Sequence, residues 1–490
     1  MTEAGKRVPP SYAGRCIHFI GVGGCGMSGI AEFVLTEGGR VSGSDLNASA
    51  ATDRLARLGA TVCVGHDAAN LPAETDLVVY SAAIKEGNPE RVEAGRRGLP
   101  AVKYAEFLGR LMTLRDGIAV AGTHGKSTTT AMLAWILSEA GLDPSFVIGA
   151  DVPQLGGCGS RVGAGRHLVV EACEYDRSFL NLSPRAATIL NIEMDHLDYY
   201  SDLADIRSAF ADLAARVHPD GLLVINGTDL GRREVVAKAA SAVETFGVGG
   251  EWDWHAEHLE TDRGRFAFDV YRRGALYGSM RLAIPGRHHV FNALAATALA
   301  AWAGATPEAI RDALARFTGV MRRMEVLGNA AGVTVVDDYA HHPTEILVTL
   351  KAAKERFAPK RLWVVFQPHQ HSRTRFLLKD FAWALTVADK TIVPDIYFVR
   401  DSEQERQAVR SQDLVDEIQQ LGADALYLAQ FDSIRRYLVE SLGPGDVLMT
   451  MGAGSVWRLA EPLLDDLAAA ARAASPAERA AAESHTEDTP

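Results

Sequence analysis

One loop constrains this chain more than any other feature. The segment AGTHGKSTTTAML, residues 121–133, follows the apolar run GIAVAG and leads into a helical stretch from Lys126 to Ala140. Glycines let backbone N–H groups approach phosphate oxygens, Lys126 supplies a positive charge, and the Ser127 hydroxyl can ligate Mg²⁺. The strict pattern has a glycine where this chain has Val120. The segment predicts a nucleoside-triphosphate site, and the alternative is a glycine-rich turn that binds nothing.

A second glycine loop lies near the N-terminus. The run GVGGCG places Gly21, Gly23 and Gly26 in the pattern G-x-G-x-x-G after an apolar strand, and Asp45 follows the next strand. Alone, this pattern indicates a dinucleotide cofactor. The diphosphate of any nucleotide uses the same helix N-terminus, so the loop predicts a pyrophosphate site more securely than it predicts NAD. A packing turn without ligand is the alternative.

Short apolar runs alternate with helical stretches along the chain, which predicts α/β units with largely parallel sheets. The run FAFDVYRRGALYGSMRLAI indicates an antiparallel hairpin that turns at RRG. Beyond Leu464 the Ala-rich sequence lacks the apolar periodicity needed to dock on a core. We expect a Rossmann-like unit, a central P-loop ATPase-type α/β unit, a Rossmann-like third unit and a flexible tail, over residues 1–113, 114–323, 324–464 and 465–490.

Composition excludes several classes of protein. The formal net charge of -12 argues against a nucleic-acid or membrane-surface binder, because these need an extended basic surface. Five cysteines without metal-type spacing indicate reduced thiols and a cytoplasmic protein. The N-terminal residues have no apolar signal region, and the chain has no apolar run of membrane-spanning length.

Two polar residues follow apolar strands of the second unit, where open α/β sheets keep their sites. Glu171 ends the run HLVVEA, and His196 lies in NIEMDHLDYY. A carboxylate there can hold Mg²⁺ opposite the phosphate loop. His196 is equally compatible with a loop histidine that binds no metal, because Mg²⁺ prefers oxygen ligands. For four nearby acids we expect a solvated loop face: Glu174, Asp176, Asp195 and Asp198.

A dense set of polar residues lies at the junction of the second and third units and in the first strands of the third unit. An arginine of the pair Arg322 and Arg323, in GVMRRME, can reach a transferring phosphate when units close, or it can form a surface salt bridge. The strand ends VVDDYAHHPTE and FQPHQHSRTR also predict a site. Within the second, Arg373 can fork onto a carboxylate.

Taken in order, the segments GTHGKSTTT, EACEYDRSF, NIEMDHLDYY, PGRHHVFNALAA, RRME, DDYAHHPTE and QPHQHSRTR resemble the Mur ligase family over nearly the whole chain. The opening IHFIGVGGCGMSGIA is most similar to members that join L-alanine to UDP-N-acetylmuramate in peptidoglycan precursor synthesis. The resemblance implies a cytoplasmic, ATP- and Mg²⁺-dependent ligase that forms an amide through an acyl phosphate, as a monomer or homodimer.

The resemblance also implies roles for particular residues. The catalytic residues would be Lys126, His196, Arg323 and His341. The ATP site would comprise Gly122, Thr123, His124, Gly125, Lys126, Ser127, Thr128, His288, Asn292, Arg323 and Asp338. The metal ligands would be Ser127, Glu171 and His196. The amino-acid pocket would be shaped by Tyr339, His341 and Arg373. The predicted UDP site comprises Gly21, Gly23, Gly24, Gly26, Ser44, Asp45, His66 and Ser81.

The chain departs from the family pattern at three places. His289 stands where the family usually has asparagine, and Gln370 stands where some alanine-adding members have arginine. The stretch RSAFADLA offers no lysine for the carbamylation found in related ligases. Three alternatives remain: a ligase that recycles a murein tripeptide onto the same UDP-sugar, an NAD-dependent oxidoreductase, and a non-catalytic nucleotide-binding regulator.

Overall fold

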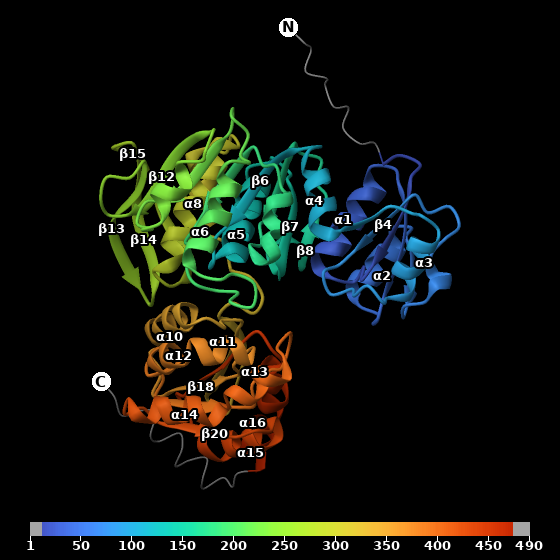
Figure 1. The fold of residues 1–490 in the computed structure, drawn as a ribbon. Coiled ribbons are helices and arrows are strands. Elements are labelled where there is room, and N and C mark those ends of the chain that lie inside the picture. The colour runs from blue at the N-terminus through green and yellow to red at the C-terminus, as the bar shows by residue number, and fades with distance from the viewer. Residues whose placement is uncertain (1–11, 474–490) are drawn as a thin grey trace.

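The computed structural model describes residues 12–473, and its strands form three sheets in three successive units. In Figure 1 the first unit, in blue, lies beside one end of the central unit, and the third unit, in orange and red, lies below the central one. The sheets are largely parallel and carry helices on their faces, so the expected fold class is confirmed.

The first unit is a parallel sheet in the order β3-β2-β1-β4-β5. The order reverses between β1 and β4, which is where open α/β sheets form ligand crevices. Its strands are β1 (Cys16–Ile20), β2 (Arg40–Asp45), β3 (Thr61–Val64), β4 (Leu77–Tyr80) and β5 (Ala101–Lys103). Its helices are α1 (Cys25–Thr36), α2 (Ala50–Arg57), η1 (Ala68–Asn70), α3 (Pro89–Arg96) and α4 (Tyr104–Met112).

The central unit has a ten-stranded sheet in the order β15-β14-β13-β12-β11-β10-β6-β9-β7-β8. The predicted hairpin is confirmed, because β14 and β15 pair antiparallel. Its strands are β6 (Asp116–Ala121), β7 (Ser145–Val152), β8 (Cys158–Arg161), β9 (His167–Glu171), β10 (Ala186–Ile189), β11 (Leu222–Asn226), β12 (Ala242–Val248), β13 (Trp254–Asp262), β14 (Arg265–Arg272) and β15 (Ala275–Pro285). Its helices are α5 (Lys126–Glu139), η2 (Pro153–Leu155), η3 (Tyr175–Asn181), α6 (Leu203–Ala214), α7 (Arg232–Val236), α8 (His288–Trp302) and α9 (Pro307–Leu314).

The third unit is a six-stranded sheet in the order β16-β17-β21-β18-β19-β20, in which only β16 runs antiparallel to its neighbour. Its strands are β16 (Glu325–Ala330), β17 (Val333–Asp338), β18 (Leu362–Phe366), β19 (Lys390–Val393), β20 (Ala425–Tyr427) and β21 (Val447–Met451). Its helices are α10 (Pro343–Phe357), α11 (His371–Phe376), α12 (Leu378–Leu385), α13 (Glu403–Ala408), α14 (Ser411–Gln420), α15 (Phe431–Ser441), η4 (Val456–Leu459) and α16 (Ala460–Ala473).

The first and central units share one apolar core. This core contains Phe33 of α1 and Phe107 of α4 together with Phe210 of α6, all buried. Helix α1 packs closely on β8, because a Cβ atom at Gly29 would lie only 2.4 Å from the Cβ atom of Ser160. The third unit has separate cores on the two faces of its own sheet.

For residues 465–473, the expectation that the sequence lacks the pattern needed to dock on a core is wrong. These residues belong to α16, whose Leu463 and Leu467 side chains are buried against the third sheet. The two leucines lie four residues apart, so one face of the helix is apolar despite the Ala-rich sequence. The remainder of the predicted tail lies outside the described residues. Among residues 12–473, no helix is both long and apolar enough to cross a membrane.

Candidate active site

The phosphate loop joins an interior strand of the central sheet to a buried helix. It follows β6, which lies between β10 and β9, and it ends where α5 begins. Gly125 has a φ of 80°, and a Cβ atom there would lie 2.7 Å from Oδ1 of Asn292. Glycine is therefore required both by the backbone conformation and by the close approach of α8. On the other side, the backbone N–H of His124 donates to Oδ1 of Asn191 at 2.7 Å.

Lys126 lies at the N-terminus of α5 and is tied to its own loop. Its Nζ atom donates to the carbonyl oxygens of Gly122 and Thr123, at 2.7 and 2.9 Å, and to Oε1 of Glu174 at 3.0 Å. Burial lowers the pKa of Lys126, but the Glu174 carboxylate outweighs burial and holds that pKa above its ordinary value. The site therefore carries a fixed positive charge at neutral pH.

Ser127 and Glu171 come together beside the loop. The Ser127 hydroxyl donates to Oε1 of Glu171 at 3.0 Å, and Oε2 of the same carboxylate accepts the Gly149 N–H at 2.7 Å. His196 points instead at Glu174, with 3.3 Å between Nε2 and Oε1, and its buried Nδ1 has no hydrogen-bond partner. These hydroxyl and carboxylate oxygens, with an imidazole nearby, fit a divalent cation next to phosphate.

A cavity of about 530 Å³ opens beside the loop. Leu190 and Phe291 give it apolar walls, while Asn226 and Thr228 add polar groups. Of the predicted ATP-site residues, it is lined by His124, Gly125, Ser127, Thr128, His288, Asn292, Arg323 and Asp338. Its size and mixed lining suit the base and sugar of a nucleotide whose phosphates lie on the loop.

His289, which departs from the family pattern, has a defined hydrogen-bond partner in this cavity. Its Nδ1 lies 3.2 Å from Nδ2 of Asn292, so the amide donates to the imidazole. Burial and the adjacent His288 hold the pKa of His289 well below its ordinary value, and burial with Arg323 lowers the pKa of His288 to about 4. Both histidines are neutral at pH 7, which keeps His289 a hydrogen-bond acceptor.

The adjacent arginines Arg322 and Arg323 have different surroundings. Arg322 donates to Oδ2 of Asp337 at 3.0 Å and to the carbonyl oxygen of Gly452 at 3.0 Å, so it braces the third unit. Arg323 lines the cavity, stacks on the Tyr339 ring and lies 3.7 Å from Glu345. Arg323 is therefore the one that faces the nucleotide cavity.

Asp338 braces the turn that follows β17. Its carboxylate accepts the backbone N–H groups of Met324 and Ala340, at 2.7 and 2.8 Å. Burial raises the pKa of Asp338 to about 6, although Arg323 opposes the shift. This carboxyl group fixes the backbone at the start of the third unit, beside the cavity.

The predicted amino-acid pocket lies between the central and third units. Arg373 is buried and donates through Nε and Nη2 to Oδ1 of Asp195, at 3.0 and 2.8 Å. The ring of His341 lies 5.4 Å from that of Tyr339. Burial lowers the pKa of His341 to about 4, so the imidazole is neutral at pH 7 and can accept a proton. Gln370 is buried with Nε2 unpartnered.

The predicted UDP-site residues lie at the carboxyl edge of the first sheet. The Gly23 N–H donates to Oδ2 of Asp45 at 2.9 Å, which closes the glycine loop on the end of β2. The Ser44 hydroxyl lies 3.0 Å from Nδ1 of His66. A Cβ atom at Gly26 would lie 2.4 Å from the Tyr104 hydroxyl, so this glycine serves packing of α1 on α4. Gly21 and Gly24 belong to this loop. Ser81 lies beside it, with its hydroxyl oxygen 3.3 Å from where a Cβ atom at Gly21 would lie.

Three family models match successive parts of the chain. They are described as "Mur ligase family, catalytic domain" over residues 16–115, "Mur ligase middle domain" over residues 120–300, and "Mur ligase, glutamate ligase domain" over residues 322–454. The chain belongs to the Mur ligase family. This confirms the resemblance seen in the ordered motifs.

Relatives of this Mur ligase match along nearly their full length. It is 42% identical to the UDP-N-acetylmuramate--L-alanine ligase of Caldanaerobacter subterraneus subsp. tengcongensis, with 92% of this chain and 97% of the relative covered. It is 44% identical to the same-named ligase of Desulforamulus reducens, at 92% and 97% coverage.

Two solved structures are similar throughout. The UDP-N-acetylmuramate-alanine ligase of Thermotoga maritima has a TM-score of 0.76 at 30% identity, covering 92% of this chain and 98% of that one. A murein peptide ligase from Psychrobacter arcticus has a TM-score of 0.68 at 28% identity, covering 93% and 99%.

The expectation of solvated loop acids in this Mur ligase is wrong for Glu174 and Asp195. Both are buried, and each forms an ion pair with a basic side chain from a distant segment, Lys126 and Arg373 respectively. Burial raises the pKa of each acid, but these cations and His196 outweigh it and leave the pKa lowered. Asp176 and Asp198 are exposed, as expected.

Sequence reasoning also missed a contact between the phosphate loop and the third unit. His124 lies 3.4 Å from Glu193 and 3.3 Å from Glu345, and its ring centroid is 4.5 Å from that of His342. Burial lowers the pKa of His124, but the two carboxylates outweigh burial and raise this pKa to about 9. In the sequence, these residues are marked only by their positions within the motifs GTHGKSTTT, NIEMDHLDYY and DDYAHHPTE.

Protonated His124 should stabilise the fold in a defined pH window. Because its folded-state pKa of about 9 exceeds the ordinary value of 6.5, this stability is complete below pH 6.5 and is lost as pH rises towards 9. Between pH 6.5 and 9, we expect Tm to fall less in the His124→Gln variant than in the wild type, because glutamine does not titrate. Thermal unfolding between pH 6 and 9.5 measures it, with His258→Gln, at a mostly exposed histidine, as control. Parallel curves for wild type and His124→Gln would contradict the assignment.

Proposed function

We propose that this Mur ligase joins L-alanine to the lactyl carboxylate of UDP-N-acetylmuramate, with ATP as the energy source. The observation that carries the proposal is Lys126, largely buried at the head of α5 beside a nucleotide-sized cavity, which Arg323 lines from the junction of the central and third units. The relatives named for this reaction match over 92% of the chain and support the choice of substrates.

In the first step, a lactyl carboxylate oxygen bonds to the γ-phosphorus of ATP as the bond to the β,γ-bridging oxygen breaks. The products are an acyl phosphate and ADP. Lys126, the N–H groups at the start of α5 and Arg323 are proposed to stabilise the charge on the transferring group. Lys126 first exchanges its contact with Glu174 for a phosphate oxygen, since its three donors are already in use.

In the second step, the alanine amine attacks the acyl carbon, phosphate leaves with the electrons of the carbon–oxygen bond, and the nitrogen loses a proton. We assign the alanine carboxylate to Arg373, which would exchange Asp195 for it. His341, neutral at pH 7, is the proposed acceptor of the amine proton. Tyr339 lies against His341, and we propose that its ring limits the space for the methyl side chain of alanine.

We propose that Ser127 and Glu171 hold Mg²⁺, with His196 close enough to join them. Bound Mg²⁺ would neutralise charge on the phosphate oxygens. The described part of α6 contains no lysine, so a carbamylated lysine of related ligases has no counterpart there. The Glu171 and Ser127 oxygens therefore carry the metal site in this proposal.

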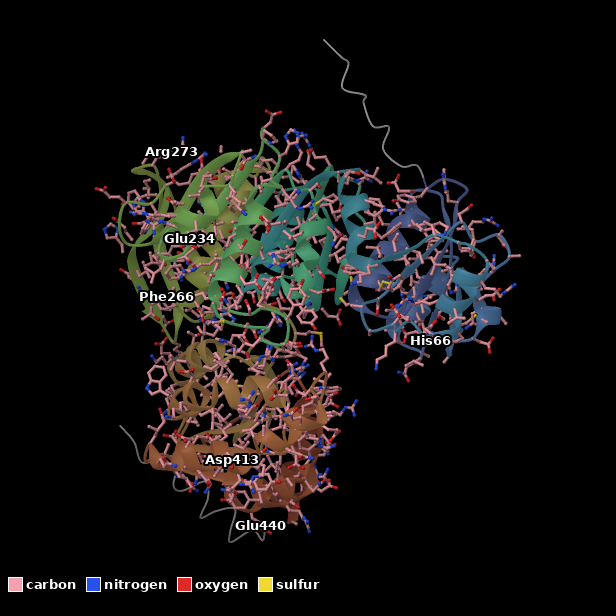
Figure 2. All side chains as sticks on the ribbon, in the orientation of Figure 1. His66, Glu234, Phe266, Arg273, Asp413 and Glu440 are labelled. Carbon is pink, nitrogen blue, oxygen red and sulfur yellow. The ribbon has the colours of Figure 1, made fainter. Side chains whose placement is uncertain are left out.

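Replacing Glu171 with glutamine should raise the Mg²⁺ concentration needed for half-maximal ADP release by about 10-fold or more. The amide keeps the shape of the side chain but removes the charge that attracts the cation. A magnesium titration of initial rates measures this. Glu234→Gln, at an exposed residue of α7 (labelled in Figure 2), is the matched control. An unchanged magnesium requirement in Glu171→Gln would remove this residue from the metal site.

The function is tested by ADP release in the presence of UDP-N-acetylmuramate and one amine substrate at a time. L-alanine should give the highest kcat/KM among L-alanine, glycine, L-serine and the tripeptide L-alanyl-D-glutamyl-diaminopimelate. Preference for the tripeptide would establish the murein-peptide reaction instead. Tight NADH binding without ATP-dependent product would establish an oxidoreductase.

We further propose that the units divide near residues 113 and 323, which lie between α4 and β6 and just before β16. We propose that the protein acts as a monomer or a homodimer. We place the reaction in the cytoplasm, where ATP and UDP-sugars are made. Sedimentation of the purified protein measures its oligomeric state.

A further inference from the structure

A buried carboxylate lies beneath the predicted UDP site and has no lysine or arginine partner among the contacts described. Glu90, at the start of α3, is fully buried. Its Oε2 accepts from Nε2 of His18 and from the Ser44 hydroxyl, each at 2.7 Å. Its Oε1 accepts from Nδ1 of His66 at 3.1 Å and from Nδ2 of Asn70 at 3.4 Å. Four donors from four segments therefore converge on one side chain.

Glu90 is ionised in this setting. Burial raises its pKa, but hydrogen bonds from His18, Ser44 and His66 outweigh burial and hold the pKa below its ordinary value. An ionised carboxylate can only accept hydrogen bonds, so each histidine must present an N–H group to it. For His18 this leaves Nδ1 to accept from the Ser42 hydroxyl, 2.8 Å away.

The same reasoning fixes the tautomer of His66. Its Nδ1 carries the proton that is donated to Glu90, so in the singly protonated ring Nε2 keeps its lone pair. The His66 side chain is 11% exposed, and it follows β3 at the carboxyl edge of the first sheet. Figure 2 shows His66 at the lower border of the first unit, on the side of the molecule where the third unit lies.

We propose that Glu90 is a positioning residue for the UDP-sugar: it holds His66 with Nε2 as an acceptor for a donor group of the uridine. This inference rests on the proposed function and on the predicted UDP site, which includes His66 and Ser44. Two groups of uridine share the required chemistry, the imide N–H of the base and a ribose hydroxyl. Glu90 acts through His66 and does not itself touch the nucleotide.

Calorimetric titration of the full-length protein with UDP tests the proposal without requiring turnover. Glu90→Gln should weaken UDP binding by about 10-fold or more, because the amide can donate to Nδ1 and reverse the tautomer of His66. Glu93→Gln, on the same helix and paired only with Arg96, should bind UDP like the wild type. In steady state, Glu90→Gln should raise KM for UDP-N-acetylmuramate and leave kcat and the KM values for ATP and L-alanine unchanged.

Parallel titrations identify the uridine donor. If the imide N–H is recognised, wild type should prefer UDP to CDP and Glu90→Gln should lose that preference. If a ribose hydroxyl is recognised, the preference lost should be that for UDP over 2′-deoxy-UDP. A wild type that binds no UDP would refute the proposed function itself. Wild-type UDP affinity in Glu90→Gln, or an equal rise in all three KM values with a lower Tm, would refute only the role of Glu90.

A measurement on the unmodified protein covers the case in which Glu90→Gln does not fold. In ¹⁵N-histidine-labelled protein, His66 should show the shifts of the Nδ1–H tautomer, with His66→Gln used to assign its signal. A ring protonated at Nε2 alone would overturn the proposal. In a His66→Gln background, Glu90→Gln should cause no further loss of UDP affinity, whereas an additive loss would show that Glu90 acts independently of His66.

Discussion

The Lys126→Ala variant is expected to release ADP with a kcat lowered on the order of 10³-fold, while the protein keeps its fold. Lys126 lies at the N-terminus of α5, where the phosphates are proposed to bind, whereas Lys351, which also lines the cavity, comes from α10 of the third unit. Truncation also leaves the buried Glu174 carboxylate without its lysine partner, beside the imidazole of His196. The decrease in kcat should therefore exceed the decrease caused by removing an exposed lysine from the surface.

Initial-rate kinetics with saturating UDP-N-acetylmuramate and L-alanine measure this effect. Lys103→Ala is the matched control, because Lys103 forms an ion pair with Asp176 in which both side chains are largely exposed. Such exposed pairs contribute little. Wild-type kcat in Lys126→Ala would remove the phosphate loop from the mechanism, and with it the proposed function.

The Arg323→Ala variant should lose about 10²-fold to 10³-fold in kcat, whereas Arg322→Ala should mainly lose stability. Arg323 lines the cavity from the junction of the central and third units, so the position of its positive charge depends on how the third unit is docked. Arg322 holds the buried Asp337 and the Gly452 carbonyl within the third unit. These adjacent arginines therefore serve as controls for one another.

Kinetics and thermal unfolding of both variants separate the two roles. Arg322→Ala should lower Tm by several degrees, because it leaves the Asp337 carboxylate buried without its cation. Arg323→Ala should keep a near wild-type Tm. The reverse pattern, with kcat lost in Arg322→Ala and kept in Arg323→Ala, would exchange the two assignments.

The sequence predicts the central elements of the site because their signals are local. A glycine loop between an apolar strand and a helix determines where phosphate binds, and the RRG turn determines the hairpin of β14 and β15. Glu171 could be placed because it ends an apolar strand next to that loop in the sheet. Each of these inferences needs only the order of residues along one short segment.

Other features could not be predicted because they depend on long-range packing. Asp195 and Arg373 are 178 residues apart, and only the docking of the third unit buries them together. The short strands β7 and β8 lack a strong alternating pattern, and they form an edge of the sheet beside α1. The end of α16 escaped notice because alanine dominates its sequence and only Leu463 and Leu467 mark the buried face.

The two junctions between units differ in kind, and this bears on how substrates enter. The first and central units are joined by shared aromatic and aliphatic packing, which resists separation in water. The third unit touches the phosphate loop and its neighbours through charged and polar pairs such as Thr344 with Glu193 and Arg373 with Asp195. Water and ligand anions can replace such pairs, so we expect the molecule to open at this second junction alone, swinging about the backbone at Arg322 and Met324, both of which have positive φ.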